Sequence, residues 1–134
     1  MDKQTNNGDA AAQKPPLTKG LVHLVRSTGY SIKALRTACK EAAFRQEILL
    51  GVVTLPLAFW LGHSALAKVL VCMGWLIVLI AELLNTAIEA IVNLASPGFH
   101  KLAGQAKDLG SASVTMALLL DGATWVFLIV EICH

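Results

Sequence analysis

The chain has 134 residues, enough for one domain, and 55% of them are apolar while only 15% are charged. Soluble domains carry about 25% charged residues, so this composition argues against a water-soluble protein and favours one that faces lipid. The formal net charge of +2 is too small to indicate a nucleic-acid-binding surface. The three cysteines are scattered, which predicts neither a disulfide framework nor a zinc site.

The first element in chain order is a polar tail. Residues 1–16 end in two prolines and lack the apolar core of a signal peptide, so they are predicted to be disordered. From Leu17 to about Lys40, apolar residues repeat on one helical face and cations lie opposite. This pattern predicts an amphipathic helix on the membrane surface, extending over 17–46. The alternative, a helix packed on a soluble core, is disfavoured because the chain offers no such core.

Three apolar stretches follow. Transmembrane helices are predicted over about 48–66, 69–95 and 111–132, because each stretch is long enough to cross a bilayer. The expected connections are a turn at Gly62–Ser64, a break at Ser96–Gly98 and a polar connector from Phe99 to Leu109. The expected fold is an all-α membrane protein with three transmembrane helices and a surface helix, in which residues 17–134 form a single domain.

The cations predict the orientation of these helices. Eight of the 11 Lys and Arg residues precede the first span, Lys68 alone follows it, and Lys101 and Lys107 lie between the second and third spans. Cytoplasmic loops are enriched in Lys and Arg. The N-terminus and the second loop are therefore expected in the cytoplasm, and the C-terminus outside.

A polar stripe runs along the second span. At about 100° per residue, Glu82, Asn85, Glu89 and Asn93 share one face of the helix. If the span begins near Val69 on the outer side, Glu82 lies roughly 9 Å below the cytoplasmic surface and Glu89 lies at that surface. Charged groups inside a span are costly and indicate function.

These two depths suit two different roles. A carboxylate among acyl chains can act as a general base near neutral pH, and a carboxylate at the water boundary can help to bind Mg²⁺ together with nucleotide phosphates. The stripe therefore suits proton removal from a membrane-embedded hydroxyl while phosphate arrives from the cytosol. The alternative is a polar seam that holds helices together.

Two further charged sites lie at the same boundary. Glu41–Glu47 precedes the first span, and Lys107-Asp108 precedes the third, either as a nucleotide contact or as an interfacial charge pair. Asp121 lies in the middle of the third span and is assigned no role. The glycine-rich loops of soluble nucleotide-binding folds are absent from the sequence.

Four stretches resemble the small bacterial (prokaryotic) integral membrane diacylglycerol kinase family. They are Gly29–Ser31, Glu41–Glu47, Glu82–Ala90 and Ala106–Ala112. The resemblance extends from about Leu17 to the end of the chain. It implies a homotrimer in the bacterial inner membrane, with active sites between subunits at the cytoplasmic interface. It also implies Mg²⁺-dependent transfer of the ATP γ-phosphate to diacylglycerol, which gives phosphatidic acid.

The resemblance implies a role for each matching residue. Glu82 matches the general base, Glu41 and Glu89 match the metal ligands, and Asn85 supports them. The residues expected to contact ATP are His23, Tyr30, Glu41, Glu89, Gly98, Phe99, His100, Lys107 and Asp108. The residues expected to bind the lipid substrate are Ser31, Phe44, Arg45, Gln46, Glu47, Trp60, Glu82 and Ser111.

The chain departs from the family pattern at several positions. Asn93 stands where better-known members have Asp, His23 stands where an Arg contacts the nucleotide, and Ile32 replaces a Trp. Two other functions stay open on the sequence. One is an undecaprenol kinase, which uses the same chemistry on a longer lipid alcohol. The other is a non-enzymatic membrane subunit whose polar stripe lines a pore or binds a partner.

Overall fold

The structure is a computed structural model that describes residues 21–96, 98 and 100–133, with side chains from Arg26 onward. The predicted disordered tail, the first four residues of the predicted surface helix, the side chain of His23, and Phe99 lie outside the described residues. Contacts divide the chain into two units with the boundary between Ala34 and Leu35. The second unit holds three long helices.

Helix α1 (Leu21–Ala38) is amphipathic, as predicted, but it ends before residue 46. A turn follows it, in which the backbone N–H of Lys40 donates to the Thr37 carbonyl at 3.0 Å and that of Glu41 to the Ala38 carbonyl at 2.9 Å. The next helix begins only at Ala42. The predicted single helix over 17–46 is therefore wrong in its last part, because these short-range hydrogen bonds close the chain into a turn.

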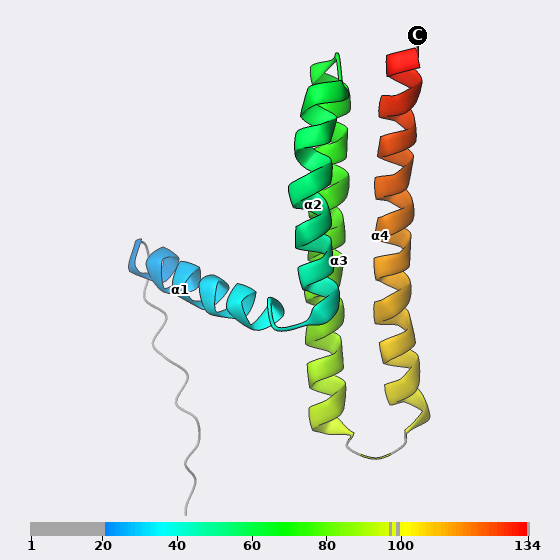
Figure 1. Cartoon of the computed structure of the whole chain (residues 1–134). Coiled ribbons are helices and arrows are strands. Elements are labelled where there is room, and N and C mark those ends of the chain that lie inside the picture. The colour runs from blue at the N-terminus through cyan, green and yellow to red at the C-terminus, as the bar shows by residue number, and fades with distance from the viewer. Residues whose placement is uncertain (1–20, 97, 99, 134) are drawn as a thin grey trace, which may run out of the picture. The chain divides into compact units, whose positions relative to one another are not determined.

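Helices α2 (Ala42–Leu61), α3 (Ala65–Ala95) and α4 (Lys101–Cys133) are each long and apolar enough to cross a membrane. Each runs antiparallel to its neighbour in the chain (Figure 1). Their surfaces carry many exposed large apolar side chains, among them Leu94 at 87% and Trp60 at 81% exposure. Such a surface is stable in lipid and not in water. The three predicted transmembrane helices are confirmed, but the first begins at Ala42 and ends at Leu61, before the predicted end at residue 66, because the turn at 62–64 interrupts it.

Of the two connections between the transmembrane helices, the first was predicted correctly and the second was not. The turn between α2 and α3 lies at 62–64, as expected, and the Ser64 hydroxyl caps α3 by accepting from the Ala67 N–H at 3.1 Å. The polar connector predicted up to Leu109 is wrong, because α4 is already helical from Lys101. Only Gly104 lowers helix propensity in this segment, so the helix continues beyond its apolar part.

Helices α3 and α4 pack against each other along much of their length. Small residues face larger ones across this interface, since a Cβ added to Gly74 would meet Asp121 and one added to Gly110 would meet Asn85. Two apolar clusters combine small and large side chains in the same way: Ala58, Ala67, Val71 and Leu128 in one, and Val78, Ala81, Val114 and Ala117 in the other. Small residues allow close backbone approach in membranes. This alternation fixes the register of α4 on α3.

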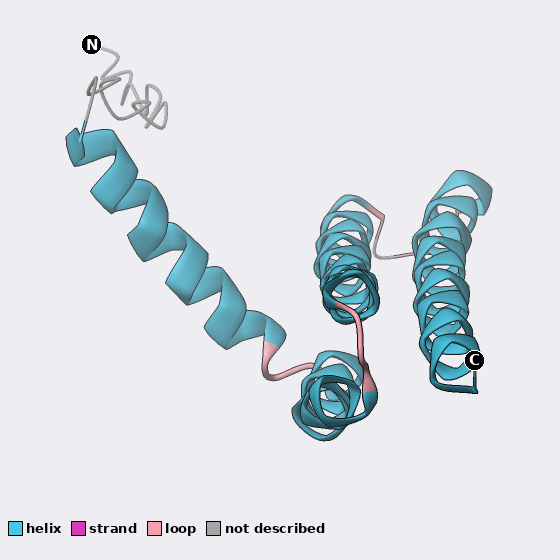
Figure 2. Ribbon diagram, turned by 90° about the horizontal axis from the view of Figure 1, so that it is seen from above, coloured by secondary structure: helices cyan, strands magenta, loops and turns pink. Residues whose placement is uncertain are grey.

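Helix α2 packs on α3 over a shorter stretch. Viewed along the three transmembrane helices, α3 lies between α2 and α4 (Figure 2). Near the turn at 62–64, Ala58 of α2 joins the cluster that includes Val71 of α3 and Leu128 of α4. The three helices are thus joined at one end of the unit, and the polar stripe of α3 lies toward the other end.

Candidate active site

The polar stripe of α3 begins with a buried carboxylate. Glu82 is only 7% exposed, whereas Glu89, seven residues further along the helix, is exposed. Seven residues correspond to a rise of about 10.5 Å with only about 20° of rotation, so the two carboxylates of α3 lie on one face at different depths.

Asn85 connects the stripe to α4. Its Nδ2 donates a hydrogen bond to Oε1 of Glu89 at 3.3 Å. Its Oδ1 is buried without a hydrogen-bond partner in the described part of the chain, and it lies where a Cβ of Gly110 would be. Gly110 is therefore the position at which α4 leaves room for Asn85, and Asn85 in turn orients the carboxylate of Glu89.

A methyl group at Gly110 tests this arrangement. In Gly110→Ala the new Cβ collides with Asn85 Oδ1, so Asn85 must move and its bond to Glu89 is lost. We expect the phosphoryl-transfer activity that the sequence predicts to fall about ten-fold, corresponding to about 1.4 kcal/mol in the activation free energy.

The matched control is Gly122→Ala on the same helix, where an added Cβ meets nothing within 4 Å. It should retain activity. Equal activity of the two variants, measured as initial rates on protein of equal thermal stability, would contradict the role given to Asn85.

A small pocket of about 150 Å³ lies where the chain passes from α3 to α4. Its lining residues are Val92, Ser96, Gly98, His100, Ala103, Gly104 and Lys107. Three of the residues expected to contact ATP, Gly98, His100 and Lys107, thus line one pocket. The pocket lies at the Glu89 end of the stripe.

Lys107 is held in place by the last residue of the stripe. Its Nζ donates a hydrogen bond to Oδ1 of Asn93 at 2.8 Å. Because an amide carries no charge, this contact orients the ammonium group without neutralising it. The ammonium group therefore keeps its positive charge beside the pocket, which suits phosphate.

The first turns of α2 carry half of the residues expected in the lipid site. Glu41 is the N-cap residue, but its side chain makes no capping hydrogen bond, so the carboxylate is not committed to its own helix. Phe44 is buried at 2% exposure, and Arg45 Nη1 donates to the Lys40 carbonyl at 3.1 Å. Gln46 is exposed and Glu47 half-buried.

The other predicted site residues do not lie beside the first turns of α2. Trp60 lies in the last turn of α2, about 20 Å along the helix from Glu47, so one chain does not bring it to the other lipid-site residues. Tyr30 and Ser31 are exposed on α1 in the first unit. Asp108 and Ser111 are exposed near the start of α4.

The donor set for a metal consists of carboxylates alone. Among the described residues there is no group of three or more His, Cys, Asp or Glu side chains that could hold a metal ion. Mg²⁺ commonly binds through one or two carboxylates plus substrate phosphates and water. Glu89, oriented by Asn85, and the uncommitted Glu41 have the chemistry for that role.

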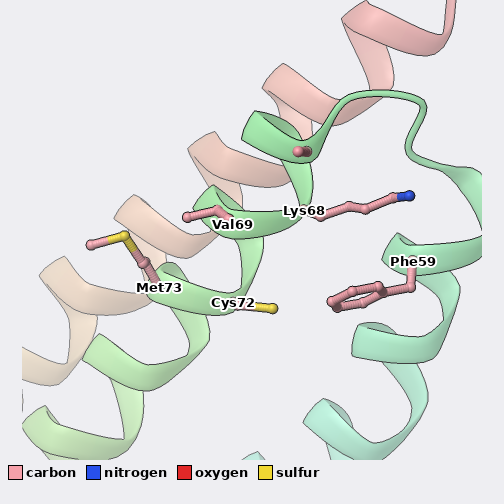
Figure 3. A pocket seen from close by; sticks show the side chains of 6 residues that line it. Phe59, Lys68, Val69, Cys72 and Met73 are labelled. Carbon is pink, nitrogen blue, oxygen red and sulfur yellow. The ribbon is translucent and has the colours of Figure 1, made fainter.

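A second pocket, of about 280 Å³, lies near the turn between α2 and α3 (Figure 3). Phe59 of α2 faces Cys72 of α3 across it, and Lys68 Nζ lies 6.0 Å from the centroid of the Phe59 ring. Its lining is otherwise apolar and it carries no carboxylate. This pocket lies at the opposite end of α3 from Glu89 and offers no groups for phosphoryl transfer.

Gly104 and Gly110 were not identified as functional from the sequence, and Asn93 was predicted to be part of the polar stripe but was given no partner. Their roles depend on the pairing of α3 with α4. One signal was present: Gly104, Lys107 and Gly110 recur every three residues at the start of α4, which places two residues without side chains close to a lysine.

Comparison with known proteins identifies the family of the chain. The profile of the prokaryotic diacylglycerol kinase family matches residues 29–129. Diacylglycerol kinases of Haemophilus influenzae and Escherichia coli are 44% and 41% identical, over 81% and 84% of this chain and 92% and 93% of their own lengths. That of Pseudomonas aeruginosa is 45% identical over 79% of this chain and 87% of its own length. The chain therefore belongs to the prokaryotic diacylglycerol kinase family.

Proposed function

We propose that this protein transfers the γ-phosphate of ATP to diacylglycerol and releases phosphatidic acid and ADP. The observation that carries the proposal is the α3 stripe: a buried carboxylate at Glu82, an oriented carboxylate at Glu89, and a pocket with Lys107 beyond it. An apolar alcohol reaches Glu82 through lipid, and a soluble triphosphate reaches the pocket from water.

Glu82 accepts the proton of the lipid hydroxyl as the oxygen bonds to the γ-phosphorus. The bond between that phosphorus and the β–γ bridging oxygen breaks, and ADP leaves with the bridging oxygen. Phosphoryl transfer depends on positioning and on stabilising the phosphate charge. Lys107 supplies one positive charge for this purpose.

Mg²⁺ would be held by Glu41 and Glu89 and would supply charge neutralisation on the phosphate oxygens. Asn85 keeps the Glu89 carboxylate directed toward that position through its hydrogen bond. The proposed contacts to the nucleotide come from nine residues: His23, Tyr30, Glu41, Glu89, Gly98, Phe99, His100, Lys107 and Asp108.

The proposed setting is a homotrimer in the bacterial inner membrane, with the active sites between subunits. The N-terminus and the α3–α4 connection lie in the cytoplasm and the C-terminus lies outside, as the cation distribution favours. The lipid site combines Ser31, Phe44, Arg45, Gln46, Glu47, Trp60, Glu82 and Ser111. Because Trp60 lies far along α2 from Glu47, it would contact the acyl chains and not the hydroxyl.

Purified protein with ATP and Mg²⁺ in bilayers, offered diacylglycerol, undecaprenol or no lipid, tests the proposal. We expect phosphatidic acid to form, with a much lower rate on undecaprenol. Phosphorylation of undecaprenol alone would overturn the substrate and support the alternative lipid kinase. No ATP consumption with any lipid alcohol would overturn the activity and favour a non-enzymatic subunit.

A further inference from the structure

A tryptophan on α3 is hydrogen-bonded to the backbone of α2. Nε1 of Trp75 donates to the carbonyl oxygen of Glu47 at 3.0 Å. The indole lies against Gly51 of α2, because a Cβ added there would collide with Trp75 Nε1, Cε2 and Cζ2. Gly51 is buried and Trp75 half-buried. The glycine thus makes the space for the ring, and the carbonyl one turn earlier receives its N–H.

This contact lies at a particular position on α3. Trp75, Glu82 and Glu89 are spaced by seven residues, so they lie on nearly the same face with a rise of about 10.5 Å between neighbours. The residue that contacts α2 is therefore an extension of the stripe that carries the proposed base and metal ligand. Its distance from Glu82 is fixed by two turns of a continuous helix.

The other fixed contact of α2 lies at its opposite end. Ala58 packs into the cluster near the turn at 62–64, while Phe44–Glu47, the α2 residues proposed to lie nearest the lipid hydroxyl, precede Gly51. Helix α2 packs on α3 over a short stretch only. Among the described residues, the hydrogen bond of Trp75 is the side-chain hydrogen bond that joins the first half of α2 to α3.

We propose that Trp75 is a positioning residue for the lipid substrate, an inference that rests on the proposed function. By holding the Glu47 carbonyl against α3, Trp75 sets the place of Phe44–Glu47 relative to Glu82. It acts through α2 and touches neither the nucleotide pocket nor the metal ligands. Its loss should therefore weaken binding of the lipid alcohol more than binding of ATP, whose proposed pocket lies between α3 and α4.

Trp75→Phe keeps an aromatic ring but removes the N–H donor. We expect the KM for diacylglycerol to rise at least five-fold and the KM for ATP to change by less than about two-fold, because the pocket with Lys107 lies between α3 and α4. Gly51→Ala should reproduce this result because the added methyl displaces the indole. Trp125→Phe, at the apolar cluster near the turn at 62–64, is the matched control and should change neither KM.

Unchanged KM values in Trp75→Phe would overturn the proposal, and so would a joint rise of both KM values, which indicates general distortion.

A second measurement does not depend on activity. Spin labels at Ala43 and Ala90, in a chain whose native cysteines are replaced, report the separation of α2 and α3. Trp75→Phe should broaden the distance distribution, and Trp125→Phe should not. If the wild-type protein proved inactive on lipids, this distance measurement alone would decide the role of Trp75, and an unchanged distribution would overturn it.

Discussion

Replacing Glu82 by glutamine is expected to lower kcat by about 10²- to 10⁴-fold, the usual contribution of a general base. Glutamine has nearly the same shape as glutamate but cannot accept the hydroxyl proton. The carboxylate is 7% exposed, so water cannot readily replace it as base. The measurement is the initial rate of phosphatidic acid formation at saturating ATP and lipid, together with ATP binding by the same variant.

ATP binding and the oligomeric state of Glu82→Gln should stay at wild-type levels, because the nucleotide pocket is lined by other residues. The matched control is Glu131→Gln, the same chemical change near the C-terminal end of α4, and it should keep its activity. Substantial turnover in Glu82→Gln would remove Glu82 as the base.

Replacing Glu89 by glutamine is expected to raise the Mg²⁺ concentration needed for half-maximal activity by about ten-fold or more, a typical cost of disturbing a metal site. Glutamine retains an oxygen that can accept the Asn85 hydrogen bond, so the geometry is preserved and only the charge is lost. The measurement is a titration of activity with Mg²⁺ at fixed ATP.

Glu82→Gln provides the comparison, because it should lower kcat without moving the Mg²⁺ midpoint. An unchanged midpoint in Glu89→Gln, with wild-type activity, would argue against a ligand role. The two substitutions thus separate proton removal from metal binding on one helix.

The apolar patterning of the sequence was sufficient to predict the three transmembrane helices and the polar stripe of α3. Long apolar runs dictate spanning helices because lipid cannot hydrogen-bond the backbone. Helix ends were harder to predict. The start of α4 was placed too late, since a search for apolar residues finds the lipid-facing part of a helix and not the polar turns that extend beyond it.

The contacts that shape the site could not be predicted in the same way. Each of these contacts joins residues from two helices: Asn85 with Gly110, Asn93 with Lys107, and Trp75 with Gly51. They depend on the register between helices, which one helix alone does not reveal. The sequence contains no Gly-x-x-x-Gly pair, but Ala67, Gly74 and Ala81 recur every seven residues on α3. This repeat places small residues on one face of α3, which allows the backbone of a neighbouring helix to approach closely.

The side of the membrane to which the α3 stripe opens is the most direct test. The background is a chain in which Cys39, Cys72 and Cys133 are replaced by serine. One variant adds Ala90→Cys, beside Glu89, and a second adds His63→Cys, in the turn between α2 and α3. An impermeant maleimide should label position 90 only from the cytoplasmic face of sealed vesicles, and position 63 only from the outer face. Labelling of position 90 from the outer face alone would contradict the account, because cellular ATP could not reach the proposed metal and nucleotide site.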